Sequence, residues 1–137
     1  MLVRLALAGF LLAHALIHIA FVSPAPPATA GGPTWPFSSS ESWLLTRLRV
    51  GPETARLVAL GLVATTIVGF SLAAVSVIGL LPVGIWAPGI AIGAVSSVGL
   101  LVAFFHPWLA LGIGIDLVLI WAVLIAGRAA AVPPIQG

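Results

Sequence analysis

The chain has 137 residues, of which 61% are hydrophobic and only 6% are charged, and its mean hydropathy is +1.28. A soluble domain of this length needs many more charged residues on its surface, so the composition indicates a membrane protein. The net charge is +2, and the sequence contains no basic run of the kind that binds nucleic acid. Cysteine is absent, which excludes disulfides, thiolate metal sites and cysteine nucleophiles.

The first apolar stretch covers residues 2–22 and ends where Ser23 and Pro24 interrupt it. It has features of a signal peptide, because Arg4 precedes the apolar run and the small residues Ala28-Thr29-Ala30 follow it. The run is nevertheless long enough to cross a bilayer, and it carries two histidines. We therefore expect an uncleaved membrane anchor.

Residues 23–53 form a connector whose first part is rich in Pro, Gly, Ala and Ser. Within it a short helix is predicted over about residues 39–49, because Ser38 and Glu41 have the spacing of a capping box. Trp43, Leu44 and Leu48 can share one face of this helix, and Arg47 lies one turn from Trp43. That arrangement is typical of a helix that lies at the membrane interface.

Three further spans are predicted, over about residues 54–81, 89–105 and 109–127, followed by a loose tail at 129–137. Pro82 and Pro88 bracket the link between the second and third spans. Because the links between these spans are short, the three helices must be antiparallel neighbours. We expect a single all-α domain over residues 1–137, an integral membrane four-helix bundle in which the first span packs against the fourth.

The arginines lie at both ends of this bundle. Arg4 and Arg128 flank one side, and the connector side carries three others, at positions 47, 49 and 56. A count of arginines alone favours a cytoplasmic connector. The first span, however, has a signal-anchor layout and usually dominates topology, so we expect both termini to be cytoplasmic.

Ionisable side chains inside the bilayer are costly, so they are interpreted as functional groups or as packing links that need partners. His14 and His18 lie one turn apart on one face of the first span. At ~1.5 Å per residue, His14 and Asp116 both lie roughly 10–12 Å below the same surface. The same side also carries His106 at the interface, Glu41, Glu53 and Arg56.

Two interpretations of this cluster remain open. In the first, His14, His18 and Asp116, with His106 at the edge, bind a haem, metal, quinone or proton. In the second, the same side chains form hydrogen bonds that join helices, and Asp116 pairs with a histidine or with Arg56. A carboxylate that orients a histidine is also a usual outer-shell feature of metal sites, so its presence does not separate the two.

Small residues recur every four positions and predict close helix packing. Gly61 and Gly69 lie on such a ridge in the second span, and Gly89 and Gly93 on one in the third. Gly112 lies one turn before Asp116 and would let another helix approach. We interpret the ridges as packing between the second and third spans rather than as a homodimer face.

Enzyme signatures are missing: the chain has no phosphate-binding loop, no His-Glu-x-x-His and no Gly-x-Ser-x-Gly. Ser96 and Ser97 lie in the third span without an obvious base at their depth, so we interpret them as packing residues. These features favour a non-enzymatic subunit or accessory factor of a membrane complex. Its partners would be the lipid bilayer and other membrane subunits or copies of itself. The alternative is a redox or ion-handling module.

The layout resembles that of small bacterial four-helix membrane proteins of the DoxX-like type. The resemblance is carried by the first helix ending at Phe21-Val22-Ser23-Pro24, and by His106-Pro107-Trp108 followed by Gly112 and Asp116. It implies a location in the cytoplasmic membrane of a bacterium and a role as subunit or accessory factor in thiol or oxidative stress or quinone oxidation. The resemblance assigns no catalytic residue.

Overall fold

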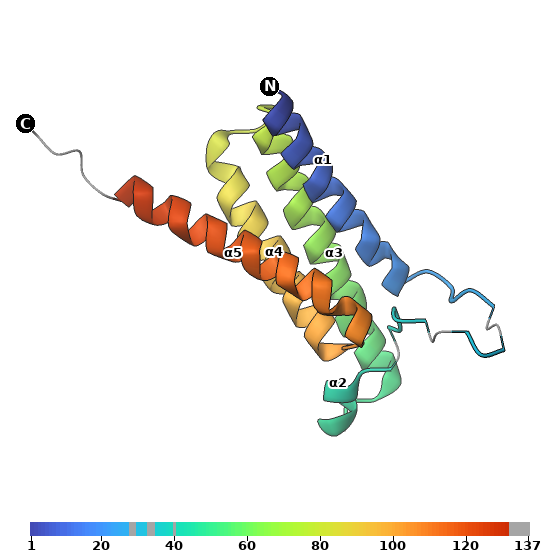
Figure 1. Ribbon diagram of the computed structural model, residues 1–137. Coiled ribbons are helices and arrows are strands. Elements are labelled where there is room, and N and C mark those ends of the chain that lie inside the picture. The colour runs from blue at the N-terminus through green and yellow to red at the C-terminus, as the bar shows by residue number, and fades with distance from the viewer. Residues whose placement is uncertain (28–29, 33–34, 40, 132–137) are drawn as a thin grey trace, which may run out of the picture.

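The computed structural model describes residues 1–27, 30–32, 35–39 and 41–131. Within these residues the regular elements are all helices, which confirms the predicted all-α class (Figure 1). Residues 28 and 29 of the small-residue stretch after the first span lie outside the described residues. So does the tail from residue 132 onwards.

Four helices are long and apolar enough to cross a membrane, which is the architecture of a multi-pass membrane protein. The first is α1 (Leu2–Ile17), continued by the short 3₁₀ helix η1 (His18–Phe21). The others are α3 (Pro52–Val77), α4 (Trp86–Ala103) and α5 (Ala110–Ala131). The links contain α2 (Trp43–Arg47), η2 (Val83–Ile85) and η3 (Pro107–Leu109).

The turn between α3 and α4 differs from the prediction at both ends. α3 ends at Val77 rather than at residue 81, because Gly79 adopts a φ of +88°. The backbone N–H of Leu80 then donates to the carbonyl of Val75 at 3.1 Å, which closes the helix in a Schellman-type turn. α4 begins at Trp86 rather than at residue 89. Pro88 falls in its first turn, where the missing N–H removes no helical bond.

The predicted interfacial helix over residues 39–49 is too long at both ends. Its N-cap is Ser42, whose hydroxyl accepts from the backbone N–H of Leu45 at 3.1 Å. Ser38 instead accepts from the N–H of Glu41 at 3.2 Å and forms a separate turn. α2 ends at Arg47, and Arg49, two residues later, has a positive φ of 56°.

The last helix is longer than predicted. α5 continues to Ala131, past the expected end at residue 127 and into the segment expected to be a loose tail. Its final residues are three alanines, which are the strongest helix formers, and a single glycine in a helix interior does not end it.

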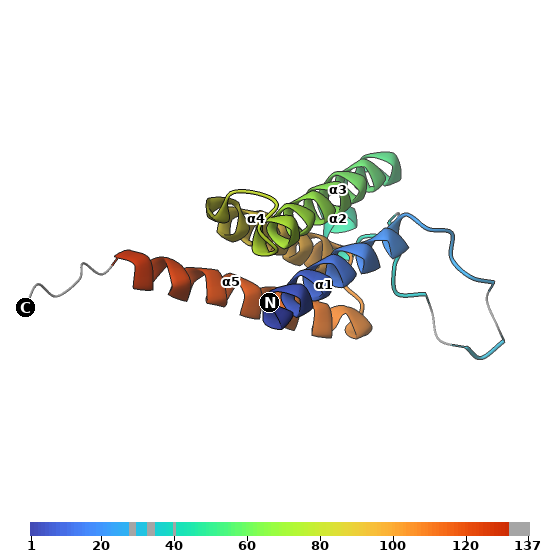
Figure 2. The same ribbon diagram turned by 90° about the horizontal axis from the view of Figure 1, so that it is seen from above.

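The helices pack in the order α1, α3, α4, α5, with α3 and α4 antiparallel at the centre (Figures 1 and 2). The first span meets the fourth, as expected, but only locally: α1 packs chiefly along α3 and α5 along α4, and His14 of α1 contacts Asp116 of α5. Beyond its first half, α5 extends away from the other three long helices (Figure 1). In the most apolar stretch of this last span only 11% of the residues are buried, against 39% in that of α3.

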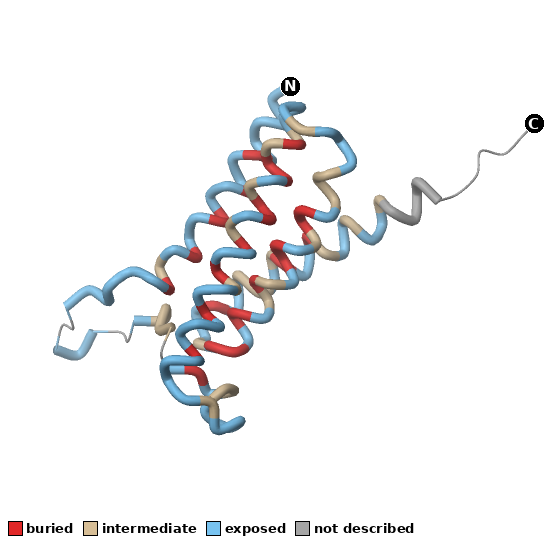
Figure 3. The backbone as a smooth tube through the Cα atoms, turned by 180° about the vertical axis from the view of Figure 1, so that it is seen from behind, coloured by how far each residue is buried: buried red, intermediate tan, exposed pale blue. Residues whose placement is uncertain are grey.

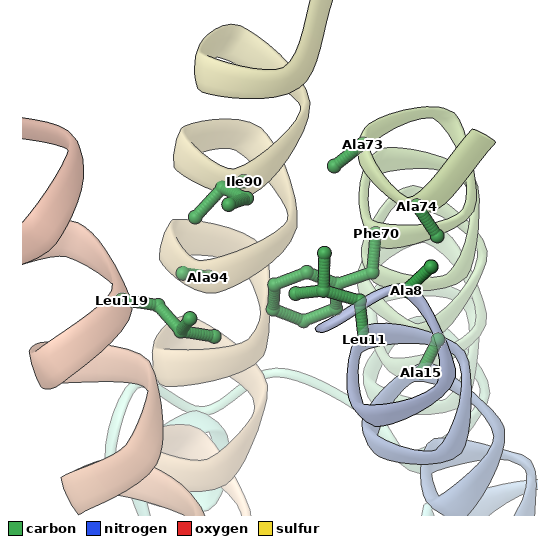
Figure 4. Close-up of a cluster of buried hydrophobic side chains, with 9 residues drawn as sticks. All are labelled: Ala8, Leu11, Ala15, Phe70, Ala73, Ala74, Ile90, Ala94 and Leu119. Carbon is green, nitrogen blue, oxygen red and sulfur yellow. The ribbon is translucent and has the colours of Figure 1, made fainter. Parts of the chain in front are cut away.

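Buried residues gather on the faces that α1, α3 and α4 turn toward one another (Figure 3). At the centre of the bundle, the ring of Phe70 projects from α3 into the space between α1 and α4, beside Leu11 (Figure 4). A second apolar cluster lies nearer the connector and includes Phe21, Phe104 and Leu109. Both clusters exclude water from the polar groups described below.

Glycines of α3 and α4 make a close contact between the two helices. A Cβ atom added at Gly69 would lie 2.6 Å from the backbone nitrogen of Gly93 and 2.9 Å from the carbonyl oxygen of Gly89. The two backbones therefore touch, as the ridge pattern predicts. Gly112 has a similar role against Leu101 of α4, whose Cδ1 would lie 2.9 Å from an added Cβ.

Gly61 does not take part in the predicted packing between the second and third spans. It lies two turns before Gly69 on the expected ridge, yet it is exposed, and an added Cβ would meet nothing within 4 Å. The packing prediction is therefore wrong at this position. Spacing alone does not reveal where along the ridge two helices come closest.

Candidate functional site

Four buried polar side chains of the spans meet between α1, α4 and α5. The end of α1, the start of α3, the end of α4 and the start of α5 all lie at the end of the bundle that carries α2 (Figure 1). His14 of α1 and Asp116 of α5 meet between these helices, with 2.8 Å between His14 Nε2 and Asp116 Oδ1. The equal depth predicted for these two residues corresponds to direct contact.

His18 is held by a change in its own helix. At His18 the α-helix tightens into η1, and the backbone N–H of His18 bonds to Ala15 and Leu16 rather than to His14. The carbonyl of His14 accepts instead from His18 Nδ1, at 2.9 Å. This bond orients the ring so that Nε2 lies 2.7 Å from the hydroxyl oxygen of Ser97 on α4.

Ser97 joins the two halves of the site. Its hydroxyl oxygen lies 2.5 Å from Asp116 Oδ2 and 2.7 Å from His18 Nε2, within hydrogen-bond distance of both. The interpretation of Ser97 as a packing residue is therefore wrong. It lies six residues before the end of α4 at Ala103, about 9 Å by the helical rise. The helical rise therefore places Ser97 near the level of His14 and Asp116, although it does not reveal the bonds that the hydroxyl makes.

We call His14, His18, Ser97 and Asp116 the polar network. Its members come from three separate parts of the chain, and all are buried: Ser97 and Asp116 are 0% exposed, His18 2% and His14 8%. Both oxygens of Asp116 and both ring nitrogens of His18 contact other atoms of the network. The network therefore joins α1 and η1, α4 and α5 through polar contacts, in addition to the apolar contacts between them.

Aromatic rings border the network. The ring of Phe70 meets that of His14 edge-on with 5.2 Å between centroids, and Phe10 stacks on His14 at 6.0 Å. Phe10 is partly exposed on the outer surface of α1, so it lies between the histidine and the lipid. Such an apolar border strengthens hydrogen bonds within the network and makes a missing partner costly.

In the described part of the chain, no three His, Asp or Glu residues are placed to hold a metal ion. A metal bound by Asp116 or His18 would have to replace hydrogen bonds that these side chains already make. A shallow pocket lies elsewhere, at the surface of α2, and is lined by Glu41, Ser42, Trp43, Thr46 and Arg47.

The other predicted site residues lie nearer the end of the bundle that carries α2. His106 caps η3, where its Nδ1 accepts from the backbone N–H of Trp108 at 3.3 Å. The remaining three predicted residues are exposed: Glu41, Glu53 and Arg56. The alternative pairing of Asp116 with Arg56 is wrong: Arg56 is exposed, whereas Asp116 is fully buried and contacts His14 through Oδ1 and Ser97 through Oδ2.

Thr66 of α3 is a further polar residue that the sequence reasoning missed. It is 0% exposed, and among the described residues its hydroxyl is the one buried side-chain polar atom without a hydrogen-bond partner. Thr66 lies one turn before Phe70, which contacts His14, and α3 runs antiparallel to α1. Thr66 is therefore level with His18.

Two side chains of the connector fasten α2 to the end of α4. The Ser42 hydroxyl donates to the carbonyl of Ala103, and Trp43 Nε1 donates to that of Val102 at 2.7 Å. Carbonyls in the last turn of a helix have no partner within the helix, so these bonds satisfy them. They also keep α2 against the end of the bundle that lies nearest the network.

Comparison of the chain with models of protein families, with curated proteins and with solved structures found no match. The resemblance to the DoxX-like type therefore stays a prediction from layout.

Proposed function

We propose that this multi-pass membrane protein is a non-enzymatic subunit or accessory factor of a membrane complex, and that the polar network is the fastening that holds its helices in place. One observation carries the proposal: the polar atoms of Asp116 and His18 are taken up by the network itself. A reactive site would instead direct at least one such group toward a substrate. Hydrogen bonds between spans are a common way of joining helices in lipid.

The surface of α5 supports association within the membrane. This helix extends away from the bundle, and Leu117, Val118 and Trp121 are each more than half exposed. In a bilayer these side chains contact lipid or a helix of a partner. We propose as partners other membrane subunits or further copies of this chain.

The association is tested by purifying the full chain from its native membrane in a mild detergent. We expect a complex whose mass exceeds that of one chain, with a membrane subunit or a second copy identified by mass spectrometry. A monodisperse monomer without a bound protein would contradict the proposal. The same sample tests the alternative function: a visible haem absorbance band, a stoichiometric transition metal or an extractable quinone would favour a redox module.

We further propose that the protein lies in the cytoplasmic membrane of a bacterium with both termini in the cytoplasm. The absence of cysteine allows a direct test with Ser39→Cys in the connector and Gly84→Cys in the turn at the opposite end. A membrane-impermeant maleimide added to intact cells should label the first variant and spare the second. Labelling only of Gly84→Cys would show the opposite orientation.

A further inference from the structure

We propose that the polar network binds one proton more than its separate side chains would carry at neutral pH, and that His18 and Asp116 share this proton through the hydroxyl of Ser97. The inference follows from the number of donors that the four hydrogen bonds of the network require. It does not depend on which partner the protein has in the membrane.

The first step concerns His18. Its Nδ1 faces the backbone carbonyl of His14, which can only accept, so Nδ1 carries a hydrogen. In a neutral imidazole the other nitrogen, Nε2, is then without a hydrogen and can only accept. If Nε2 carries a hydrogen as well, His18 is an imidazolium.

The second step concerns Ser97, which has one hydroxyl hydrogen and two close neighbours, at 2.7 Å and 2.5 Å. If the hydroxyl donates to Asp116, His18 Nε2 must donate to Ser97, and His18 is charged. If the hydroxyl donates to His18, Asp116 must be protonated and donate to Ser97. Both arrangements contain one proton beyond neutral His18 and ionised Asp116.

The third step concerns His14. Neutral His14 can donate to Asp116 Oδ1 from its own Nε2 hydrogen, so this bond needs no additional proton. If Asp116 donated to His14 instead, the hydroxyl of Ser97 would still serve only one of its two neighbours. The smallest number of added protons that completes all four bonds is therefore one.

The charge of the buried network also requires one added proton. Neutral histidines beside an ionised Asp116 would bury a net charge of −1 among apolar helices. The single hydrogen of the Ser97 hydroxyl would then serve only one of its two neighbours, and the other contact, to His18 Nε2 or to Asp116 Oδ2, would have no hydrogen. Adding one proton brings the charge of the network to zero and completes every bond. Charges in the bilayer are rare unless they are compensated.

The proton can move between two positions without changing the total. When it leaves His18 Nε2 for the oxygen of Ser97, the hydroxyl proton of Ser97 passes to Asp116 Oδ2. His18 then changes from charge +1 to neutral, Asp116 from −1 to neutral, and Ser97 regains its original form. No other reactant is needed.

The other titratable groups of the packed helices are remote. On α1, Arg4 lies ten residues from His14, and on α3, Arg56 lies ten residues from Thr66, each about 15 Å along the helix. Glu53 is exposed in the first turn of α3, and α4 contains no titratable side chain. On the described side chains of α5, Asp116 is the titratable group. His14 is the neighbouring titratable group and is part of the network.

The proton count can be measured directly on the wild-type full chain in lipid nanodiscs, because Asp116 is the only aspartate in the sequence. Aspartate labelled with ¹³C reports the protonation of this one carboxyl group by NMR. Histidine labelled with ¹⁵N reports the protonation of both ring nitrogens of His18. At pH 7.5 we expect a carboxylic acid with neutral His18, a carboxylate with doubly protonated His18, or exchange between the two. A carboxylate with neutral His18, or an acid with doubly protonated His18, would overturn the proposal.

Asp116→Asn provides a second, independent test. The amide can donate to Ser97 and accept from His14, so every bond can form with neutral histidines and no added proton. Between about pH 7 and pH 9, an unfolded chain has neutral histidine and ionised aspartate. The wild-type protein thus binds one proton more when folded, and its stability falls as pH rises, with an unfolding constant that increases up to tenfold per pH unit.

We expect the midpoint of thermal unfolding of the wild type to fall from pH 7 to pH 9, and that of Asp116→Asn to stay level. All other titratable groups are common to the two proteins, so the difference isolates the network. An equal pH dependence in both proteins would overturn the proposal. Failure of Asp116→Asn to fold would also count against it, because the amide reproduces the donors of protonated Asp116.

Discussion

Two contacts between helices in this protein achieve close packing by different means. At the crossing of α3 and α4, Gly69 and Gly93 bring two backbones together, and shape alone determines the fit. Between α1, α4 and α5, the polar network joins the helices through hydrogen bonds. The first contact tolerates no added atom, whereas the second tolerates a change of atoms that preserves donors and acceptors. The two contacts should therefore respond differently to substitution and to pH.

The largest effect is expected at the glycine contact. Gly69→Ala would place a methyl group against the backbone of α4, which cannot move as a side chain can, and should lower the free energy of unfolding by about 3 kcal/mol. Chemical unfolding in mixed micelles measures this change. Gly61→Ala is the matched control: its Cβ position is open, so stability should be unchanged or rise by up to about 1 kcal/mol. Equal losses in both variants would show that the crossing lies elsewhere.

Ser97→Ala should have the next largest effect. It removes the bridge between His18 and Asp116 and should cost about 1–2 kcal/mol, in the range of polar contacts between membrane helices. It should also reduce the fall in stability between pH 7 and pH 9, because no hydroxyl remains to share the proton. Ser96→Ala is the matched control: it also removes a serine hydroxyl, but from the neighbouring residue, which is outside the network. It should change stability by less than about 0.5 kcal/mol. If the two variants behave alike, Ser97 is only a packing residue.

A smaller and local effect is expected for Ser42→Ala. This change removes the N-cap of α2 and its bond to the end of α4, a loss of about 1 kcal/mol for a typical cap. Amide hydrogen exchange should become faster in α2 and in the last turn of α4, with exchange around Phe70 unchanged. Uniformly faster exchange would mean that α2 stabilises the whole bundle.

The smallest effect, and one of opposite sign, is expected for Thr66→Val. Valine has nearly the shape of threonine and removes a buried hydroxyl without a partner, so stability should rise by up to about 1 kcal/mol. Thermal unfolding measures the change. A loss of stability would show that the hydroxyl takes part in the neighbouring network.

The sequence was sufficient to predict the four spans and the common depth of His14 and Asp116, because apolar length and helical rise determine both. It could not predict that His18 reaches Asp116 through Ser97, since a hydroxyl in an apolar helix can also bond to its own backbone. Nor could it locate the contact of α3 and α4 at Gly69 rather than Gly61. That position depends on the crossing of two helices, which residue spacing on one helix does not determine.

The central claim is that His14 and Asp116 act on each other directly as part of a fastening between α1 and α5. A double-mutant cycle of His14→Leu and Asp116→Leu, measured by reversible unfolding of the full chain, tests it most directly. We predict that the double variant loses about 1 kcal/mol less stability than the sum of the two single losses, as expected for residues in polar contact within a membrane. Losses that add to within about 0.3–0.5 kcal/mol would contradict the account.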